Sequence, residues 1–340
     1  RESAVGKIKG FLSGIYSPFG VRGMRDALRR ERPDIVNVHN LYPFISPAAL
    51  FECKKAGVPI VMTIHNFRLI CPTGLFMRDG LPCEVCLERG NEWSCVRYNC
   101  ECSRLKSIGY TIRNVCARWI GAYRKNVAAF ACITDFQRQK LIAAGYDSEK
   151  IVVIPNFLPM PKLYENEVGK YVAFCGRISR EKGVDLILEV ARRNPYILFK
   201  LAGEVRDKGL VEDLPSNCEL VGYLSGESLS RFYRESAFFV MASKWYEGFP
   251  MAILEAACYG KPTIGPAHGG FTEIIGRGEQ TIGDLFEPNN LDDLERKVVS
   301  LWNRPDEIAR LGEKAFEKLK REYSSEVIYQ KWDNLFQKLI

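Results

Sequence analysis

Two glutamates separated by seven residues, Glu247 and Glu255, lie in a stretch that suits a ligand with both phosphates and hydroxyls. The apolar run 237–242 predicts a buried strand before them, Pro250 suits the first turn of a helix, and Gly260 suits its end. Free N–H groups at a helix start bind anions, and carboxylates accept hydrogen bonds from diols. A nucleotide sugar carries both kinds of group.

Two cations follow an earlier strand candidate, 172–175, in the loop before the helix that Gly183 opens. Ligands of open α/β sheets bind outside the carboxyl ends of the strands, so Arg177 and Lys182 should reach the same edge as Glu247. A departing diphosphate develops negative charge that such cations neutralise. The alternative interpretation is an ordinary charged surface loop.

The elements that must position these residues form two series of strands and helices, which predicts parallel sheets covered on both faces. The first series has strand candidates at 34–39, 59–65, 128–134 and 151–154, with helices over 47–56 and 135–144. The second has strand candidates at 172–175, 198–202, 218–221, 238–241 and 263–265, followed by a mostly helical tail over 291–340. Three prolines in the seven residues 155–161 predict a linker between the series.

Composition is consistent with two domains and excludes several classes. The 340 residues can form two cores, and 46% hydrophobic with 26% charged residues is usual for a globular protein. No apolar run reaches the ~20 residues of a membrane span. Neither series carries G-x-G-x-x-G after a strand, which weakens a dinucleotide oxidoreductase interpretation.

The net charge of +7 favours anionic partners or reflects simple solubility. Basic residues gather in one segment with apolar neighbours: Arg104, Lys106, Arg113, Arg118, Arg124 and Lys125. Such a stretch either lies on a membrane surface or forms an ordinary half-buried helix, and the pattern fits both.

The stretch 245–262 resembles the E-x7-E signature of retaining glycosyltransferases of family 4. Upstream, Y-V-A-F-C-G-R-I-S-R-E-K-G-V-D-L-I-L over 171–188 is similar to that family's strand, G-R loop and helix. Downstream, K-P-T-I-G-P-A-H-G-G over 261–270 is similar to its next strand and Gly-Gly loop. The resemblance runs from about residue 33 to the C-terminus. It implies the GT-B fold, an α/β architecture of two Rossmann-like domains whose parallel sheets face a central cleft.

The resemblance divides the chain into an acceptor-side domain over 1–158, a nucleotide-sugar domain over 159–325 and a C-terminal helix over 326–340 that can pack back on the first domain. The family normally begins with a strand and a Gly-rich loop. Here the first 32 residues are helix-like and basic, so we expect a truncated or reduced start.

The resemblance also implies residue roles. Arg177 and Lys182 would contact the donor diphosphate, and Glu255 would hold the ribose hydroxyls. Glu247 and His65 would lie near the reacting centre, with His39 a weaker candidate. Further donor-site residues would be Gly176, Tyr223, Gly248, Phe249, Pro250 and Met251, and the nucleobase would lie near 201–203 and 221–224.

The implied activity is retaining transfer of a hexose from a UDP- or GDP-sugar to a glycan or polyprenyl-linked acceptor in polysaccharide or cell-surface glycan synthesis. We expect a cytoplasmic protein, with peripheral contact at the inner face of the membrane left open, no catalytic metal and no nucleic-acid partner. One alternative is a GT-B epimerase that acts on a nucleotide sugar alone. Another is a zinc-stapled, non-enzymatic module that binds an anionic polymer.

The cysteines form a second signal, since six of the twelve fall between Cys71 and Cys102. A C-x2-C knuckle, Cys83 and Cys86, with further thiols nearby, suits structural zinc, and disulfides are the rival in an oxidising compartment. Some family 4 enzymes carry a similar insertion, which matches Cys71, Cys83, Cys86 and Cys100. We therefore predict a four-thiolate zinc site on these residues, within an insertion over about 71–102.

Overall fold

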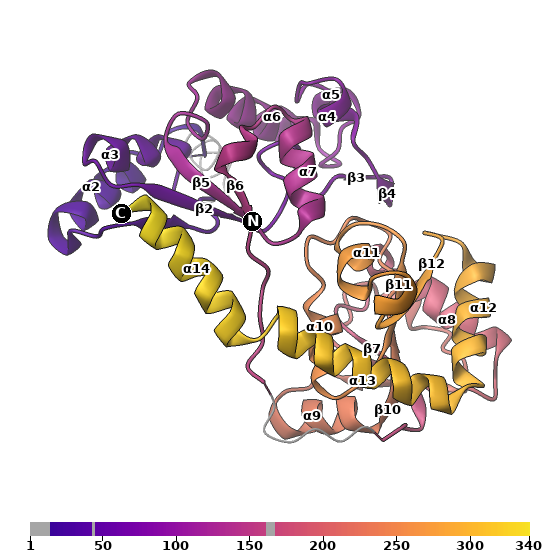
Figure 1. The fold of residues 1–340 in the computed structure, drawn as a ribbon. Coiled ribbons are helices and arrows are strands. Elements are labelled where there is room, and N and C mark those ends of the chain that lie inside the picture. Colours follow the sequence, from indigo (N-terminus) through magenta and orange to yellow (C-terminus); the bar gives the residue numbers. More distant parts are fainter. Residues whose placement is uncertain (1–13, 43–44, 161–166) are drawn as a thin grey trace. The chain divides into compact units, whose positions relative to one another are not determined.

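The computed structural model describes residues 14–42, 45–160 and 167–340, and the chain divides into two compact units. The first unit comprises the described residues of Arg1–Arg78, Cys83–Ile154 and Gln330–Ile340, and the second comprises Asp79–Pro82 and Pro155–Tyr329. Figure 1 shows the course of the chain. Each unit has a parallel sheet of its own, which confirms the predicted α/β class with two Rossmann-like domains.

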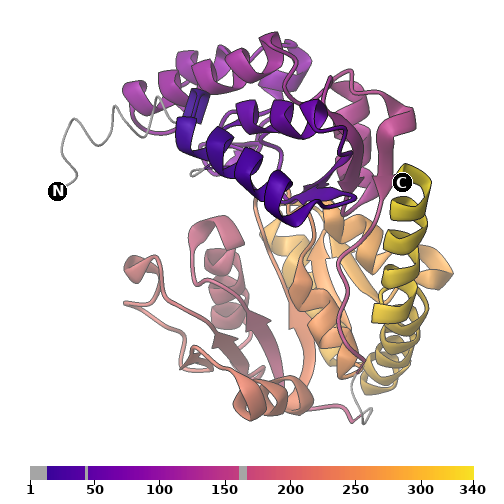
Figure 2. The same cartoon turned by 90° about the vertical axis from the view of Figure 1, so that its left-hand side faces the viewer.

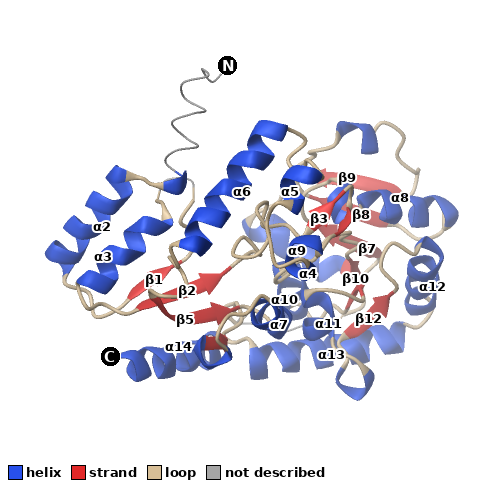
Figure 3. Cartoon of the chain, turned by 90° about the horizontal axis from the view of Figure 1, so that it is seen from above, coloured by secondary structure: helices blue, strands red, loops and turns tan. Residues whose placement is uncertain are grey.

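The sheet of the first unit has the order β1-β2-β5-β6, and all of its pairs are parallel. Its strands are β1 (Val36–Val38), β2 (Ile60–Ile64), β5 (Val127–Cys132) and β6 (Ile151–Val153). Every residue of β2 is buried, as expected for a continuous apolar run in a parallel sheet. Figure 3 shows these strands with the helices beside them. All four carboxyl ends share one edge.

Helices of the first unit start at recognisable caps. In α2 (Pro18–Glu31), Ser17 Oγ accepts a 3.1 Å hydrogen bond from the N–H of Gly20. In α7 (Asp135–Ala143), Thr134 Oγ1 accepts from the N–H of Gln137 at 3.3 Å. A short 3-10 turn (Pro47–Ala49) leads into α3 (Leu50–Lys55).

Between β2 and β5 the chain makes the cysteine-rich excursion. It contains the two-stranded sheet of β3 (Met77–Arg78) and β4 (Leu81–Pro82), then α4 (Val85–Glu88), α5 (Ser94–Arg97) and the longer α6 (Arg104–Trp119). The short elements explain why sequence periodicity shows no regular structure there.

The sheet of the second unit is entirely parallel and has the order β12-β11-β10-β7-β8-β9. Its strands are β7 (Tyr171–Cys175), β8 (Phe199–Ala202), β9 (Cys218–Gly222), β10 (Ser236–Val240), β11 (Thr263–Pro266) and β12 (Gly283–Phe286). The chain runs outward from β7 to β9, then returns to place β10 on the other side of β7. The strand order therefore reverses between β7 and β10, the position where open α/β sheets bind ligands.

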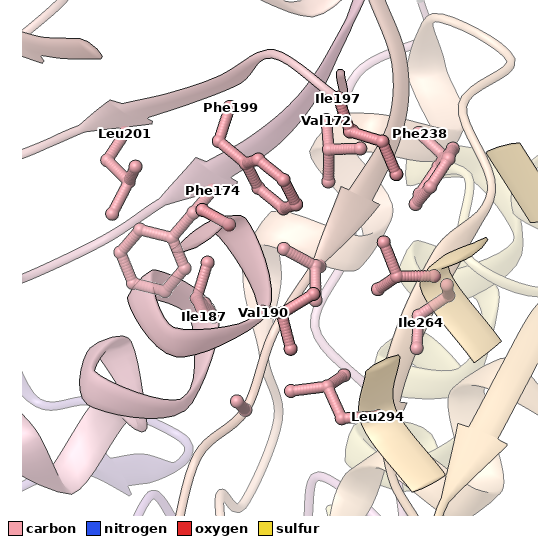
Figure 4. Close-up of a cluster of buried hydrophobic side chains, with 14 of the residues drawn as sticks. Val172, Phe174, Ile187, Val190, Ile197, Phe199, Leu201, Phe238, Ile264 and Leu294 are labelled. Atoms are coloured by element: carbon pink, nitrogen blue, oxygen red, sulfur yellow. The ribbon is translucent and has the colours of Figure 1, made fainter. Parts of the chain in front are cut away.

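Two apolar layers cover the faces of this sheet. Val172 and Phe174 of β7 pack in one cluster with α8 (Val184–Arg193) and α12 (Leu291–Trp302), as Figure 4 shows for the α8 side chains Ile187 and Val190. The alternate residues Tyr171 and Ala173 pack in a second cluster with α9 (Gly226–Glu235) and α10 (Met251–Cys258). The period-two alternation of a strand produces both layers.

The remaining helices are α11 (Gly270–Ile275), α13 (Pro305–Glu322) and α14 (Ser325–Leu339), the last two drawn in gold and yellow in Figure 2. The predicted linker, described as far as residue 160, has no helix or strand, only an isolated bridge from Leu158 to Ser324. Among the helices in the described ranges, none combines the length and apolarity that crossing a bilayer requires.

Candidate active site

The loops after the strands of the second unit carry the predicted donor-site residues. Gly176 and Arg177 follow β7, Glu247 lies in the loop after β10, and the exposed Tyr223 follows β9. Because β7 and β10 are adjacent and parallel, their following loops meet at one edge of the sheet. That edge is the reversal point of the strand order.

An ion pair joins these two loops. Lys182 Nζ lies 2.8 Å from Glu247 Oε1, and only 14% of the Lys182 side chain and 10% of the Glu247 side chain are exposed. Ser243 Oγ donates to the same carboxylate oxygen. No described residue donates to Glu247 Oε2, so one oxygen is left for hydroxyl groups of a ligand.

Trp245 lies beside both predicted cations. Its ring centroid is 5.6 Å from Lys182 Nζ and 5.9 Å from the guanidinium carbon of Arg177. Arg177 is half-exposed and reaches Glu181 at 3.9 Å. The indole Nε1 of Trp245 is buried without a hydrogen-bond partner. Two cations and an unpaired N–H donor therefore lie close together, and this combination suits the binding of an anion.

Gly183 lets the two loops approach this closely. It has a φ of 68°, and a Cβ there would lie 1.8 Å from the carbonyl oxygen of Ala242. Lys244 then fastens the loops, since its N–H donates to Glu181 O at 2.9 Å and its Nζ lies 2.5 Å from Asp185 Oδ2. The backbone contact at Gly183 thus positions Lys182 opposite Glu247.

The predicted Gly-Gly loop after β11 also contacts Glu247. The N–H of Gly270 donates to Glu247 O at 2.9 Å, and His268 Nε2 lies 2.9 Å from Ser243 O. Burial lowers the pKa of His268, which favours a neutral ring that donates to this carbonyl. His268 thereby supports the loop that holds Ser243.

The start of α10 differs by one residue from the prediction. Pro250 is the residue before the helix, and Met251 begins it without a side-chain cap. The N–H of Ile253 donates to Pro250 O at 3.1 Å, whereas the N–H groups of Met251 and Ala252 receive no side-chain oxygen, which leaves these two for a ligand. Phe249 is buried and packs on Tyr323, with ring centroids 5.8 Å apart. Phe249 thus packs in the core, and only its backbone remains a candidate for ligand contact.

Glu255 is held by a tyrosine from another helix. Tyr233 Oη donates to Glu255 Oε2 at 2.5 Å, and the Tyr233 ring stacks on Phe239 and Tyr259 with centroids 4.6 and 5.4 Å away. Burial, followed by the neighbouring Cys175 and Glu255, raises the pKa of Tyr233, so the phenol keeps its proton. Because Cys175 ends β7 directly before Gly176 and Arg177, Glu255 lies at the same sheet edge as the cations.

His65 lies in the first unit, after β2. Its Nε2 is 2.8 Å from Nδ1 of His39, which follows β1, and the two rings stack with centroids 5.1 Å apart. Burial and then the neighbouring His39 lower the pKa of His65. One ring nitrogen donates and the other accepts in this hydrogen bond.

Sequence reasoning missed Ser243, Trp245 and Tyr233. The first two could have been found, because they lie in the loop directly after a predicted strand and within four residues of Glu247. Tyr233 offered no signal, since its contact with Glu255 depends on how α9 and α10 pack.

The predicted zinc ligands are neighbours in the first unit, and all twelve cysteines are free thiols. The pKa of Cys86 is raised to about 12, by burial first and then by Cys71, Cys100 and Cys83. Cys95, which was not predicted, is hydrogen-bonded to Cys100. Across the described residues, however, no three or more His, Cys, Asp or Glu side chains are arranged to hold a metal ion. The zinc site therefore stays a prediction.

Metal analysis tests that prediction. Protein purified under reducing conditions should carry about one zinc per chain, and Cys86→Ser should lose it because a structural site needs four ligands. Cys102→Ser is the matched control, since Cys102 is exposed in the same segment and is not a predicted ligand. Zinc-free wild-type protein, or equal zinc content in both variants, would contradict the prediction.

Family models match two adjoining stretches of the chain. Residues 3–160 match the model described as Glycosyltransferase Family 4, and residues 160–318 match the model described as Glycosyl transferases group 1.

Individual proteins agree with these matches. An uncharacterized 42.6 kDa protein in the cps region of Klebsiella pneumoniae is 26% identical over 88% of this chain and 77% of its own length. A GDP-mannose-dependent alpha-mannosyltransferase of Corynebacterium glutamicum is 30% identical over 77% of this chain, which spans 58% of that enzyme's length. Among solved structures, Anabaena HepE in complex with UDP superposes with a TM-score of 0.70 at 13% identity, covering 99% of this chain and 84% of HepE. This last likeness concerns the fold.

Proposed function

The chain belongs to the family 4 glycosyltransferases, and from this premise we propose that it is a retaining hexosyltransferase that uses a nucleotide-diphosphate sugar. The observation that carries the proposal is the buried Lys182–Glu247 pair at the strand reversal, beside Arg177 and Trp245. Cations at this position suit a diphosphate, and the free oxygen of Glu247 suits a sugar hydroxyl.

In the proposed reaction the protein positions the donor and stabilises charge. Lys182, Arg177 and the first amides of α10 neutralise the diphosphate as its bond to the sugar breaks. Glu247 orients the sugar hydroxyls, and Glu255 binds the ribose diol. Retention then follows from departure and attack on the same face of the sugar, with the leaving phosphate oxygen taking the proton of the incoming hydroxyl.

The donor class has support from related proteins. HepE was solved with UDP, and the Corynebacterium relative depends on GDP-mannose, so both nucleobases occur among proteins similar to this chain. We propose a UDP- or GDP-sugar as donor and a glycan or lipid-linked hydroxyl as acceptor, in the synthesis of a surface polysaccharide. We place this work in the cytoplasm at the inner face of the membrane. The exposed Leu105, between Arg104 and Lys106 at the start of α6, and the exposed Trp119 at its end support that placement.

Donor binding provides the test. UDP- and GDP-sugars should be screened by thermal shift, because a bound donor stabilises the folded protein by mass action. Glu255→Gln should weaken the best donor by about 10- to 100-fold, since hydrogen bonds to a charged group contribute roughly 1.5–3 kcal/mol. Tyr233→Phe should have a smaller effect in the same direction, because it removes the donor that orients Glu255.

Glu313→Gln, at an exposed position on α13, is the matched control and should bind like the wild type. No stabilisation by any nucleotide sugar, or equal affinity in Glu255→Gln and the control, would contradict the proposed donor site. Release of an epimerised nucleotide sugar in the absence of acceptor would instead identify an epimerase.

A further inference from the structure

A polar pocket lies within the first unit, at the carboxyl ends of β1 and β2. Its lining includes the His39–His65 pair, Asn40, Asn66 and Arg68. The two asparagines are joined by a 3.1 Å hydrogen bond from Asn66 Nδ2 to Asn40 Oδ1. Imidazole and amide groups of this kind donate to and accept from the hydroxyls of a sugar or polyol.

Tyr42, which also lines the pocket, has two guanidinium groups near its ring. The guanidinium carbon of Arg113 is 4.2 Å from the Tyr42 ring centroid, and that of Arg68 is 5.8 Å away. Arg113 is 7% exposed and donates to Pro72 O at 2.8 Å and to Asn114 Oδ1 at 3.2 Å. It is an internal charge, whereas Arg68 faces the pocket.

Neither arginine is neutralised by a carboxylate in the described part of the chain. The carboxyl group of Glu101 interacts electrostatically with both arginines, but it forms no ion pair with them, and burial raises its pKa. Arg68 Nε is buried and has no hydrogen-bond partner. Burial lowers the pKa of Arg113, and the charge of Arg68 lowers it further, so the two cations repel each other.

Two buried carboxylates of this unit, by contrast, each have a cationic partner. Glu92 accepts both hydrogen bonds of Arg118 at 2.9 Å, and Glu52 pairs with Arg25 at 2.8 Å and Lys55 at 2.9 Å. Burying charge without a counterion is costly, so Arg68 at the pocket, with Arg113 near it and also without a carboxylate partner, favours an anionic occupant. A phosphate matches better than a carboxylate, because its charge of up to two balances both cations and its oxygens fit the guanidinium fork.

We propose that this pocket is an acceptor subsite which holds a phosphate group through Arg68, and this inference rests on the glycosyltransferase function proposed above. Arg113, inside the protein, raises the positive potential in the pocket and orients Tyr42. The histidine and asparagine pairs bind the hydroxyl-bearing part of the same molecule. The acceptor is therefore a phosphate-bearing sugar or polyol, either free or linked to a lipid.

The test compares probes that differ only in phosphate. The full chain is first saturated with UDP or GDP, whichever the thermal-shift screen shows to bind, so that the donor-phosphate site is filled. Glycerol 3-phosphate or glycerol is then titrated by calorimetry. Arg68→Gln should weaken glycerol 3-phosphate about tenfold or more, the usual scale for one charge-assisted contact. The hydrogen bonds of Arg68 to Asn66 and Asn114 involve its backbone, so the substitution leaves them in place.

Arg89→Gln is the matched control, an exposed arginine of the same unit with the same charge change, and should bind as wild type. Arg68→Lys keeps the positive charge but loses the forked guanidinium, so its affinity for glycerol 3-phosphate should lie between those of Arg68→Gln and Arg89→Gln. It replaces Arg68→Gln in the test if that variant is unstable. Phosphatidylcholine vesicles with and without polyprenyl phosphate form the second arm. Arg68-dependent binding only to the phosphate-bearing vesicles identifies a lipid-linked acceptor, and Arg68-dependent binding only in solution identifies a free one.

Two outcomes would overturn the subsite. In the first, Arg68→Gln and Arg89→Gln bind glycerol 3-phosphate with equal affinity and bind the phosphate-bearing vesicles equally. In the second, the wild type binds glycerol 3-phosphate no better than glycerol and binds both vesicle types equally. Equal vesicle binding by all variants would show general membrane adsorption, which also contradicts it. Affinity for UDP and for GDP is measured in the same proteins, so a chain that binds neither reveals a failure of the proposed function, while the phosphate result is still read directly.

Discussion

Glu247→Gln and Lys182→Met should each reduce sugar transfer by at least about 10²- to 10³-fold, the usual loss when one preorganised charge-stabilising group is removed. Lys182 is expected to act on the diphosphate and Glu247 on the sugar, so both changes should lower turnover. Transfer is measured with the donor identified by thermal shift. Turnover at the wild-type rate by both variants would remove the site assignment.

The same pair predicts an unusual pattern of stability. Both side chains are largely buried, so each single variant leaves an unpaired charge and should lose roughly 3–5 kcal/mol in the free energy of unfolding. The double variant removes both charges and should be more stable than either single one. Urea denaturation of the four proteins forms a double-mutant cycle.

A surface pair supplies the comparison. Arg310 and Glu307 are bonded at 2.7 Å on α13, but half of the Arg310 side chain is exposed. The corresponding variants there should change stability by less than about 1 kcal/mol and leave transfer unchanged. If the interaction free energy from the Lys182–Glu247 cycle is as small as that of the Arg310–Glu307 pair, the two residues do not act as a buried ion pair.

Gly183→Ala should lower stability by several kcal/mol and remove donor binding at the same time. A Cβ would overlap the carbonyl oxygen of Ala242 at 1.8 Å, and the left-handed backbone adds about 1–2 kcal/mol of strain. Relieving the overlap requires the loop after β7 to move away from the loop after β10. Lys182 and Glu247 would then separate.

Gly278→Ala separates the two causes. Gly278 has a φ of 64°, close to that of Gly183, but a Cβ there would meet nothing within 4 Å. Its variant should show the backbone strain alone and bind the donor normally. Similar melting temperatures and donor affinities for both variants would contradict the close-approach explanation.

The parallel sheets were predictable because strands buried on both faces appear as short apolar runs. Residues 172–175 and 238–241 correspond to β7 and β10 with boundaries shifted by one or two residues. β12 was missed, since Gly-Asp-Leu-Phe carries only two large apolar side chains. The β3–β4 strands were missed because two residues are too few to show alternation.

For the donor site, the sequence predicts the individual residues but not the contacts between them. Lys182 and Glu247 each follow a strand, and this much is visible in the sequence. Their direct pairing depends on β10 returning beside β7, which is a property of strand order and not of either motif. The contact of Tyr233 with Glu255 depends on the packing of α9 against α10. Neither contact produces a pattern in the sequence that could predict it.

The buried lysine–glutamate pair also has a consequence for selectivity in the cell. In the resting protein the ammonium already has a counterion, so orthophosphate or a free metabolite must compete with an internal carboxylate to occupy it. In the proposed donor site, a nucleotide sugar would overcome this competition because its ribose, sugar and second phosphate would bind at the same time. The vacant enzyme is thereby protected from the abundant small anions around it, and its lysine becomes available only to a ligand large enough to engage the whole edge of the sheet.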